Sequence, residues 1–389
     1  MNRVKFGDVV QEIKINVDRT TDAHEYFIAG EHMDSSNIHI TRRGRFSESD
    51  VGPAFIRLFR PGQVLYGSRR TYLRKVAVAD FEGITSNTTF VLETKDSNRL
   101  LQELLPYIML TDRFSEYAIN NSKGSTNPYI LFKDLAAYEF DLPTIEEQRQ
   151  LVVLLSACDR AKEAYKRLLK QTDEVVKSQF IEQFVLDKSH PREQLRGNIV
   201  EMFIGPFGSA LKNDCFVEES NAYCMVYEQK HAIQKSMDLP TRYVDEKKFR
   251  ELARFNIQPG DVIVSCRGTI GEVFVVPDNA PMGIMHPSIM KVRLNRKRYN
   301  NVFFAMLLEH YMEEHKQEAN GTGVKMAVSA STLEKECFVI PEKSIQDAFV
   351  AFAEQSDKSK FVDLQTTISE LYTCRIKSLS IYGGQCYAE

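Results

Sequence analysis

One sequence pattern occurs twice in this chain, about 198 residues apart. The first copy reads Arg60-Pro61-Gly62-Gln63-Val64-Leu65, and the second reads Gln258-Pro259-Gly260-Asp261-Val262-Ile263. At the same spacing, Leu135, Pro143 and Gln148 are matched by Leu333, Pro341 and Gln346. An internal repeat of this length predicts two similar globular units, each followed by a helix. Such a plan favours a protein that contacts two similar targets at once.

Length and composition are those of an ordinary soluble protein with two or three domains. The chain has 389 residues, a formal net charge of −3 and 43% hydrophobic residues. No apolar run reaches the roughly 18 residues of a membrane-spanning helix, and the first residues lack the apolar stretch of a signal peptide. The seven cysteines include no CxxC pair, which argues against a disulfide framework and a zinc site. We therefore expect a cytoplasmic protein without membrane contact.

The small net charge hides two basic regions, one in each copy. Residues 42–75 are rich in arginine, and their acids are Glu48 and Asp50. Residues 242–298 are also basic, with more acids among them. A basic patch can bind a phosphate backbone, and it can equally be a solvated face of mixed charge. Charge alone leaves both interpretations open.

The pattern of apolar and turn-forming residues divides the chain into four segments. Residues 1–144 have the composition of short strands and turns, with helical spacing over 98–120, and form a first globular unit. Residues 145–187 predict a long helix, because Thr144 and Glu147 make a capping-box pattern and no Pro or Gly interrupts the run to Phe184. Residues 188–341 form the second unit, and 342–389 predict a distal long helix. The fold class is therefore α+β, with mixed sheets and helices in each unit.

Both long helices carry apolar residues at heptad spacing. In the central helix these are Leu151, Leu154, Tyr165, Leu168 and Val175, and in the distal helix they are Phe361, Leu364, Ile368 and Leu371. A helix of some 40 residues is roughly 60 Å long, more than one small unit can bury. We expect the two helices to pack against each other as an antiparallel coiled coil that separates the two units.

Motifs of catalysis are hard to find in this sequence. It contains no phosphate-binding GxxxxGK[ST] loop, no dinucleotide-binding GxGxxG and no metal-binding HExxH. Asn127-Pro128-Tyr129 is similar to the base-holding motif of amino-methyltransferases, but a turn is the simpler interpretation. Asp80 with Glu93-Thr94-Lys95 is similar to the metal site of some nucleases, but the pattern is common by chance. The sequence thus predicts no catalytic residue, no metal site and no cofactor in this chain.

Residues suited to binding DNA are better represented. Arg can bridge two acceptors on guanine, Asn pairs with adenine, and Lys and Arg neutralise phosphates. In the first copy the candidates are Ser68, Arg69, Arg70, Thr71, Tyr72, Arg74 and Lys75, with Lys123, Asn127 and Tyr129 in a later loop. In the second copy they are Arg267, Thr269, Lys291, Thr322 and Lys325. Any one of them can be an ordinary surface residue, but the two groups together favour DNA.

Four segments give the chain a resemblance to a known family. They are Pro259-Gly260-Asp261-Val262-Ile263-Val264 followed by Arg267-Gly268-Thr269-Ile270-Gly271, Ile204-Gly205-Pro206-Phe207-Gly208-Ser209-Ala210-Leu211-Lys212, Leu142-Pro143-Thr144-Ile145-Glu146-Glu147-Gln148-Arg149, and Ser178-Gln179-Phe180-Ile181-Glu182-Gln183-Phe184. Their order and repetition resemble the specificity subunits of type I restriction–modification systems along essentially the whole chain. The first unit departs from the pattern, with Lys14-Ile15-Asn16-Val17 where the second has Gly-Pro-Phe-Gly.

The resemblance implies a non-enzymatic subunit with two target-recognition domains, at 1–144 and 188–341. Each would read one half of a bipartite, asymmetric DNA site, and the coiled coil would set the spacer between the halves. The coil would also dock two modification subunits, which carry the methyltransferase chemistry and bind S-adenosylmethionine, and restriction subunits join them in some complexes. Two alternatives stay open from the sequence: a single-chain DNA methyltransferase or nuclease, and an adaptor that binds proteins and no DNA.

Overall fold

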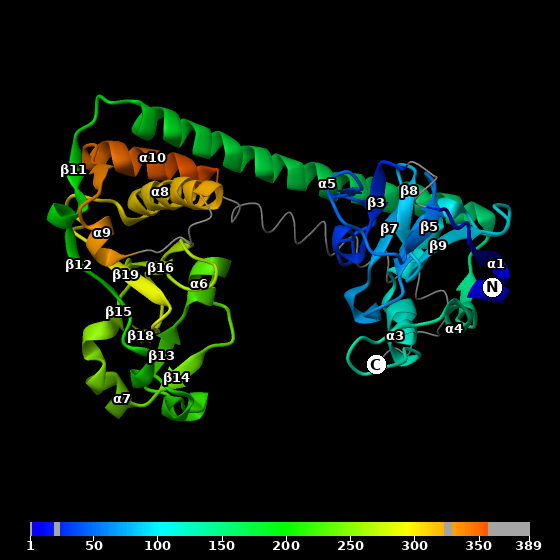
Figure 1. Ribbon diagram of the computed structural model, residues 1–389, viewed down its shortest axis with the longest axis horizontal. Helices are drawn as coiled ribbons and strands as arrows, with labels where there is room; N and C mark the ends of the chain where they lie inside the picture. Colours follow the sequence, from blue (N-terminus) through cyan, green and yellow to red (C-terminus); the bar gives the residue numbers. More distant parts are fainter. Residues whose placement is uncertain (1, 19–23, 323–328, 357–389) are drawn as a thin grey trace. The chain divides into compact units, whose positions relative to one another are not determined.

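The computed structural model describes residues 2–18, 24–322 and 329–356 (Figure 1). Contacts within the chain divide it into two compact units. Unit 1 includes the chain from Met1 to Leu169, and unit 2 runs from Lys170 to Lys360.

Unit 1 is built from sheets of short strands. The first sheet has the order β2-β9-β6-β7 and is antiparallel, with strands Val10–Glu12, Thr89–Thr94, Val64–Gly67 and Val76–Val78. The second has the order β4-β3-β8-β5, with strands Gly44–Arg45, Tyr26–Ile28, Gly83–Ser86 and Phe55–Phe59, and its β3–β8 pair is parallel. Strands β1 (Asn2–Lys5) and β10 (Glu139–Leu142), which are far apart in the sequence, form a separate antiparallel pair.

The sheets of unit 2 repeat those of unit 1 strand for strand. The order β12-β19-β16-β17 is formed by Ile199–Ile204, Ile289–Leu294, Val262–Ser265 and Val273–Val275. The order β14-β13-β18-β15 is formed by Arg242–Val244, Cys224–Tyr227, Gly283–Met285 and Asn256–Ile257, again with a parallel central pair, β13–β18. The pair β11 (Arg192–Gln194) and β20 (Cys337–Val339) corresponds to β1 and β10. The sequence repeat is therefore a repeat of topology.

Helices of 4 to 22 residues connect or follow the strands in both units. Unit 1 has α1 (Phe6–Val9), α2 (Leu105–Met109), α3 (Asp112–Asn120) and α4 (Phe132–Ala136). Unit 2 has α6 (Gln229–Gln234), α7 (Glu246–Glu251), α8 (Asn301–Thr322), α9 (Ala330–Leu333) and α10 (Lys343–Gln355). The helical stretch expected over 98–120 is broken before α3, because the Thr111 side chain accepts a hydrogen bond from the Phe114 N–H and caps a new helix.

The repeated Pro-Gly motif makes the turn that starts a central strand in each unit. Gly62 has φ +87° and Gly260 has φ +81°, a left-handed conformation that glycine adopts without strain. The residue after each glycine stabilises the turn through its side chain. The Arg60 N–H donates to Gln63 Oε1 at 2.6 Å, and the Gln258 N–H donates to Asp261 Oδ2 at 2.8 Å. The strands β6 and β16 that follow are buried and rich in Val, Ile and Leu, as expected for strands at the centre of a sheet.

A second repeated residue, the glutamine at the start of each exit helix, joins that helix to its unit. Gln148 Nε2 donates to the carbonyls of Arg99 and Pro143, while its Oε1 accepts from the Leu101 N–H. Gln346 makes the same set of bonds with Arg298, Pro341 and Asn300. Both side chains are fully buried. Each amide satisfies three backbone groups that would otherwise lack hydrogen-bond partners, which explains why a glutamine occurs at this place in both copies.

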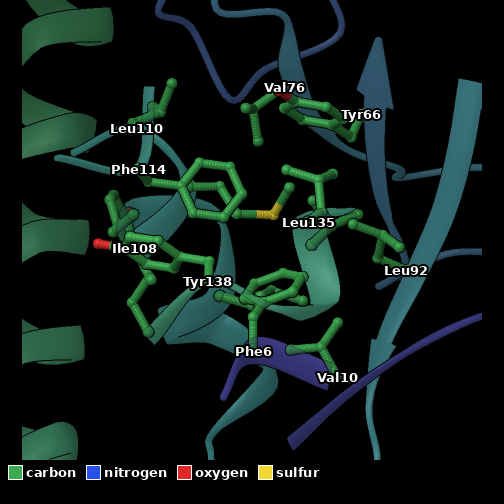
Figure 2. Packing of buried hydrophobic residues seen from close by; sticks show 14 of the residues in the cluster. Phe6, Val10, Tyr66, Val76, Leu92, Ile108, Leu110, Phe114, Leu135 and Tyr138 are labelled. Carbon is green, nitrogen blue, oxygen red and sulfur yellow. The ribbon is translucent and has the colours of Figure 1, made fainter. Parts of the chain in front are cut away.

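The core of unit 1 lies between its antiparallel sheet and its helices. Figure 2 shows Phe6, Phe114 and Tyr138 in one cluster with Leu135, Val10 and the strand residues Tyr66 and Leu92. The rings of Phe114 and Tyr138 meet edge to face with centroids 5.2 Å apart, a favourable arrangement for buried aromatic pairs. Leu155 of the exit helix is also fully buried in this cluster.

Helix α5 (Ile145–Phe180) has 36 residues and continues as a π-helical turn over Ile181–Leu186. Its predicted start is confirmed, because the Thr144 N–H donates to Glu147 Oε2 at 2.8 Å and the Glu147 N–H donates to Thr144 Oγ1 at 3.4 Å. Tyr165 is buried and Leu151 packs against the core of unit 1, whereas Leu154, Leu168 and Val175 are exposed. Phe361, Leu364, Ile368 and Leu371 lie outside the described residues, so the coiled coil stays a prediction.

Candidate nucleic-acid interface

Two loops predicted to bind DNA in the first copy lie side by side in unit 1. The first follows strand β6 and spans 68–75, and the second spans 122–129 after helix α3. The Arg70 N–H donates to the Pro128 carbonyl at 2.6 Å, and the Ile130 N–H donates to the Ser68 carbonyl at 2.9 Å. Lys123 and Tyr129 exchange backbone hydrogen bonds of 2.7 and 2.9 Å, which closes the second loop. We call the joined loops the Arg69 surface.

The exposed side chains of the Arg69 surface are those that suit DNA. They include two guanidinium groups, two phenols, an ammonium and an amide, carried by Arg69, Arg70, Tyr72, Tyr129, Lys123 and Asn127. Tyr72 is 53% exposed, an unusual amount for so large a ring. Among the described residues, neither Arg69 nor Arg70 has an ion-pair or hydrogen-bond partner for its guanidinium. Cations and rings without protein partners fit phosphate contact and base recognition.

Ser68 and Thr71 require a correction, because both are buried. Ser68 Oγ donates to the Thr88 carbonyl at 2.6 Å, and Thr71 Oγ1 lies 2.9 Å from Ser122 Oγ. These hydroxyls hold the loops in place and have too little exposed surface to touch DNA directly. Sequence patterns could not separate them from their exposed neighbours, since the loop residues follow no fixed period.

The backbone of the first loop is strained at two arginines. Arg70 has φ +51° and Arg74 has φ +47°, a left-handed conformation that costs an L-residue roughly 1–2 kcal/mol. The corresponding positions of unit 2 are Gly268 at φ +64° and Gly271 at φ +81°, where no such strain arises. Arg74 gains an ion pair with Asp112 at 2.7 Å. Arg70 has no comparable bond among the described residues, and strain of this kind often marks a functional position.

Other cations of the surface are engaged with the protein. Lys75 Nζ donates to the Gly30 carbonyl, and burial lowers the pKa of this ammonium, with Arg70 lowering it further. Lys123 forms an ion pair with Asp134 at 3.0 Å. The Lys123 pair and that of Arg74 are partly exposed, so phosphate groups could still compete for these cations.

One histidine in each unit has a matching structural role. His32 Nδ1 accepts the Ala29 N–H at 3.0 Å, and His231 Nδ1 accepts the Glu228 N–H at 2.9 Å. Each forms the turn after the first strand of the parallel pair, and burial lowers the pKa of both imidazoles. Their similar spacing to the rest of the repeat was the signal that could have found them.

Unit 2 has the same loop after strand β16. The Cys266 N–H donates to the Ser288 carbonyl at 2.8 Å, as the Ser68 N–H does to the Thr88 carbonyl in unit 1. Arg267 and Thr269 are exposed on this loop, as DNA contacts need to be. Thr322 is the last residue of α8, but its side chain and the whole of Lys325 lie outside the described residues.

Lys291, also predicted to contact DNA, is 0% exposed and lies inside unit 2. Its Nζ donates to Glu201 Oε2 at 2.8 Å and to the Asn256 carbonyl at 2.9 Å. The prediction for Lys291 is therefore wrong, because its buried ammonium is paired within the sheet with the partly exposed Glu201. Arg293 completes that cluster through Glu201 and Asp261.

The near-matches to catalytic motifs have structural roles. Glu93 accepts a hydrogen bond from Gln63 at 2.8 Å, and Lys95 Nζ donates to the Gly7 carbonyl at 2.5 Å. Asn127-Pro128-Tyr129 lies in the loop that pairs with Arg70. Over 2–18, 24–322 and 329–356, no group of three His, Cys, Asp or Glu is arranged to hold a metal ion. No helix in the same part of the chain is long and apolar enough to span a membrane.

Comparison with known proteins identifies the family. The model of the type I restriction modification DNA specificity domain matches residues 20–172 and 218–379, which is most of the chain. The chain belongs to this family. The two matched segments correspond to the two copies of the repeat, and membership in the specificity-subunit family assigns the chain as a non-catalytic part of a restriction–modification complex rather than as an enzyme.

Relatives of this specificity subunit are found in bacteria and archaea. The type I restriction enzyme MjaIX specificity subunit of Methanocaldococcus jannaschii is 27% identical over 336 residues, which are 80% of this chain and 75% of that protein. The EcoDI specificity subunit of Escherichia coli is 27% identical over 146 residues, but this match spans only 38% of the chain and 31% of that subunit.

Solved structures share the fold of the specificity subunit. One belongs to a study of complex assembly and conformational transition in the type I system, with a TM-score of 0.57, 16% identity and coverage of 99% of this chain and 98% of that one. The S subunit from M. genitalium has a TM-score of 0.53 and 13% identity, and covers 99% of this chain and 96% of its own. The expected two-domain architecture of mixed sheets and helices is confirmed by these likenesses.

Proposed function

We propose that the chain binds double-stranded DNA in a sequence-specific way within a type I restriction–modification complex. Unit 1 and unit 2 each read one half of a bipartite, asymmetric site. The observation that carries this proposal is one framework built twice, with a loop after the central strand in both copies and different side chains on each loop. Identical frameworks suit the same backbone geometry of DNA, and different side chains suit different bases.

Corresponding positions of the two loops differ in charge and size. Arg70 of unit 1 corresponds to Gly268 of unit 2. Lys75 corresponds to Glu272, since the Gly67 N–H donates to the Lys75 carbonyl at 3.0 Å and the Ser265 N–H donates to the Glu272 carbonyl at 2.9 Å. Glu272 is itself neutralised by Lys316 at 2.7 Å. Two loops with such different donors select different base sequences, so the site is asymmetric.

Exposed apolar side chains on α5 support a docking role for this helix. Val153 is 70% exposed, and Leu154 and Val175 are exposed as well, although water-facing positions of a helix usually carry polar residues. We propose that these residues contact two modification subunits, which supply S-adenosylmethionine and the methyl transfer in the cytoplasm, with restriction subunits as further partners. The helix, paired with the distal one, sets the spacer between the half-sites.

Two alternatives make different predictions. A single-chain methyltransferase would label DNA from S-adenosylmethionine without partners, and a single-chain nuclease would cut it with Mg²⁺. A protein adaptor would show no salt-dependent DNA binding. Neither alternative uses Arg69, Arg70 and Arg267, whose guanidinium groups have no partner among the residues that the structure describes.

The test is selection from a pool of duplexes with randomised bases, using the complex of this chain with its modification subunits. Wild type should enrich a motif with two separated halves. Arg69→Ala with Arg70→Ala should relax one half, and Arg267→Ala should relax the other, because each base contact is worth about 1–3 kcal/mol. A uniform loss in both halves would mark these residues as phosphate contacts, and an unchanged motif in both variants would contradict the proposal.

A further inference from the structure

Gln229 is the first residue of helix α6, directly after strand β13. Its side chain is half-buried, and its Oε1 atom is buried without a hydrogen-bond partner. A buried amide group without a partner costs about 1–3 kcal/mol relative to one that is satisfied. Such a group in a folded protein therefore calls for an explanation.

The neighbours of Gln229 are all used by the fold. Glu228 forms ion pairs with Arg242 and, at 2.7 Å, with Lys230, and these cations keep the pKa of its half-buried carboxyl low against the opposing effect of burial. His231 caps the turn through Nδ1. Within the described part of the chain, Gln229 alone of these side chains makes no bond that would fix its position.

The Gln229 amide lies against the loop that carries Arg267. A Cβ atom added to Gly268 would be 3.7 Å from Gln229 Nε2 and 4.0 Å from its Oε1, so the amide borders the exposed backbone of that glycine. Burial lowers the pKa of His286, which directly follows the parallel neighbour β18, and Arg242 and Arg267 lower it further. The Gln229 amide thus borders the Arg267 loop of unit 2 at Gly268.

Unit 1 has the reciprocal arrangement at this place. The matched histidine caps make Gly30 the counterpart of Gln229, and Gly268 is the counterpart of Arg70. Unit 1 therefore has a long side chain on the loop and a glycine on the turn, with nothing within 4 Å of a Cβ added to Gly30. Unit 2 has the glycine on the loop and the long side chain on the turn. Each unit offers one long polar side chain at this point, from opposite sides.

We propose that Gln229 is a specificity-determining residue of unit 2 and reads an adenine in its half-site. This inference rests on the proposed function, because it assumes that the Arg267 loop faces the bases. An amide can donate from Nε2 to adenine N7 and accept at Oε1 from the adenine N6 amino group, a bidentate pair on the major-groove edge. Because Oε1 is buried in the free protein, this contact requires the amide, which no hydrogen bond holds in the described part of the chain, to rotate outward. Bound DNA then provides the partner that Oε1 lacks in the free protein.

The experiment is the randomised-duplex selection with the purified complex, applied to three variants of this helix. Gln229→Ala should lose preference at one adenine of the half-site that Arg267→Ala also relaxes, by roughly 5- to 100-fold. Gln229→Glu should shift that position towards cytosine, whose N4 amino group donates to a carboxylate. Gln234→Ala is the matched control, since Gln234 is an exposed glutamine at the other end of α6, and it should leave the motif unchanged.

Thermal unfolding separates a reading role from a structural one. Because the Gln229 amide makes no hydrogen bond to the described part of the chain and its buried Oε1 is unsatisfied, Gln229→Ala should unfold at or above the wild-type temperature while its motif relaxes. An unchanged motif in both Gln229 variants, while Arg267→Ala relaxes its half, overturns this inference and leaves the proposed function standing. Relaxation at a base other than adenine overturns the adenine assignment. A wild-type complex that enriches no motif overturns the proposed function itself, and this inference with it.

Discussion

Arg70→Gly should stabilise the chain, or leave its stability unchanged, and still damage DNA recognition. The left-handed backbone at Arg70, φ +51°, costs an L-residue roughly 1–2 kcal/mol. Glycine removes that strain but loses about 0.5–1 kcal/mol more backbone entropy on folding. Since no described group pairs with the Arg70 guanidinium, no further loss is expected. The net change in the free energy of unfolding lies between about zero and a gain of about 1.5 kcal/mol, and Gly268 shows that the repeat accommodates glycine here.

Recognition should change in the opposite direction. Loss of a bidentate contact from Arg70 to guanine weakens discrimination by about 1–3 kcal/mol at one base pair. The measurements are denaturant unfolding of the purified chain and motif selection with the complex. Arg74→Gly is the matched control, because it relieves the same kind of strain but breaks the Arg74–Asp112 ion pair, worth about 0–1 kcal/mol for a partly exposed pair. It should leave the selected bases unchanged. The reasoning is refuted if Arg70→Gly lowers stability by more than about 1 kcal/mol while the motif stays intact.

Three further predictions concern stability. Gln346→Ala should destabilise unit 2 by about 2–4 kcal/mol in denaturant unfolding, because it leaves the Asn300 N–H and two carbonyls without partners; a loss below 0.5 kcal/mol would show that water replaces the amide. Lys291→Ala should cost about 1–3 kcal/mol by the same assay, because the Asn256 carbonyl loses its buried donor while the partly exposed Glu201 keeps Arg293; a stable variant with an altered DNA motif would restore Lys291 as a contact. The His39–Asp159 ion pair should stabilise the fold most at low pH, because the hydrogen bond to Asp159 raises the pKa of His39. That contribution is fully present below the pKa of His39 in the unfolded chain and is lost as pH rises through the higher folded value. The melting temperatures of wild type and His39→Gln should therefore converge between pH 6 and pH 9, and a gap that widens with pH would contradict this assignment.

The sequence was sufficient to predict the architecture because the repeated residues form the turns and helix attachments that determine it. Pro61-Gly62 and Pro259-Gly260 require a left-handed turn before a buried strand, and Gln148 and Gln346 tie each exit helix to its unit. Thr144 and Glu147 marked the start of α5 in the same way. Each of these signals depends on residues that are close together in the sequence, so it can be recognised from the sequence alone.

The side chains of the candidate site were less predictable, because their roles depend on neighbours far along the chain. Lys291 looked like any basic residue, but its place in β19 puts it beside Glu201, 90 residues earlier. Thr71 contacts Ser122, 51 residues later, and Ser68 donates to the Thr88 carbonyl, 20 residues later, so the burial of both depends on distant loops. Gln229 gave no signal at all, since only the fold brings its amide to Gly268.

The central claim, that each unit reads its own half of a DNA site, is tested most directly by exchanging one unit. The chain with residues 1–144 replaced by those of a related specificity subunit should be produced with its modification subunits in a host, and the methylated positions sequenced. The account predicts a motif with one new half, one wild-type half and an unchanged spacer. A motif in which both halves change, or neither does, would contradict it.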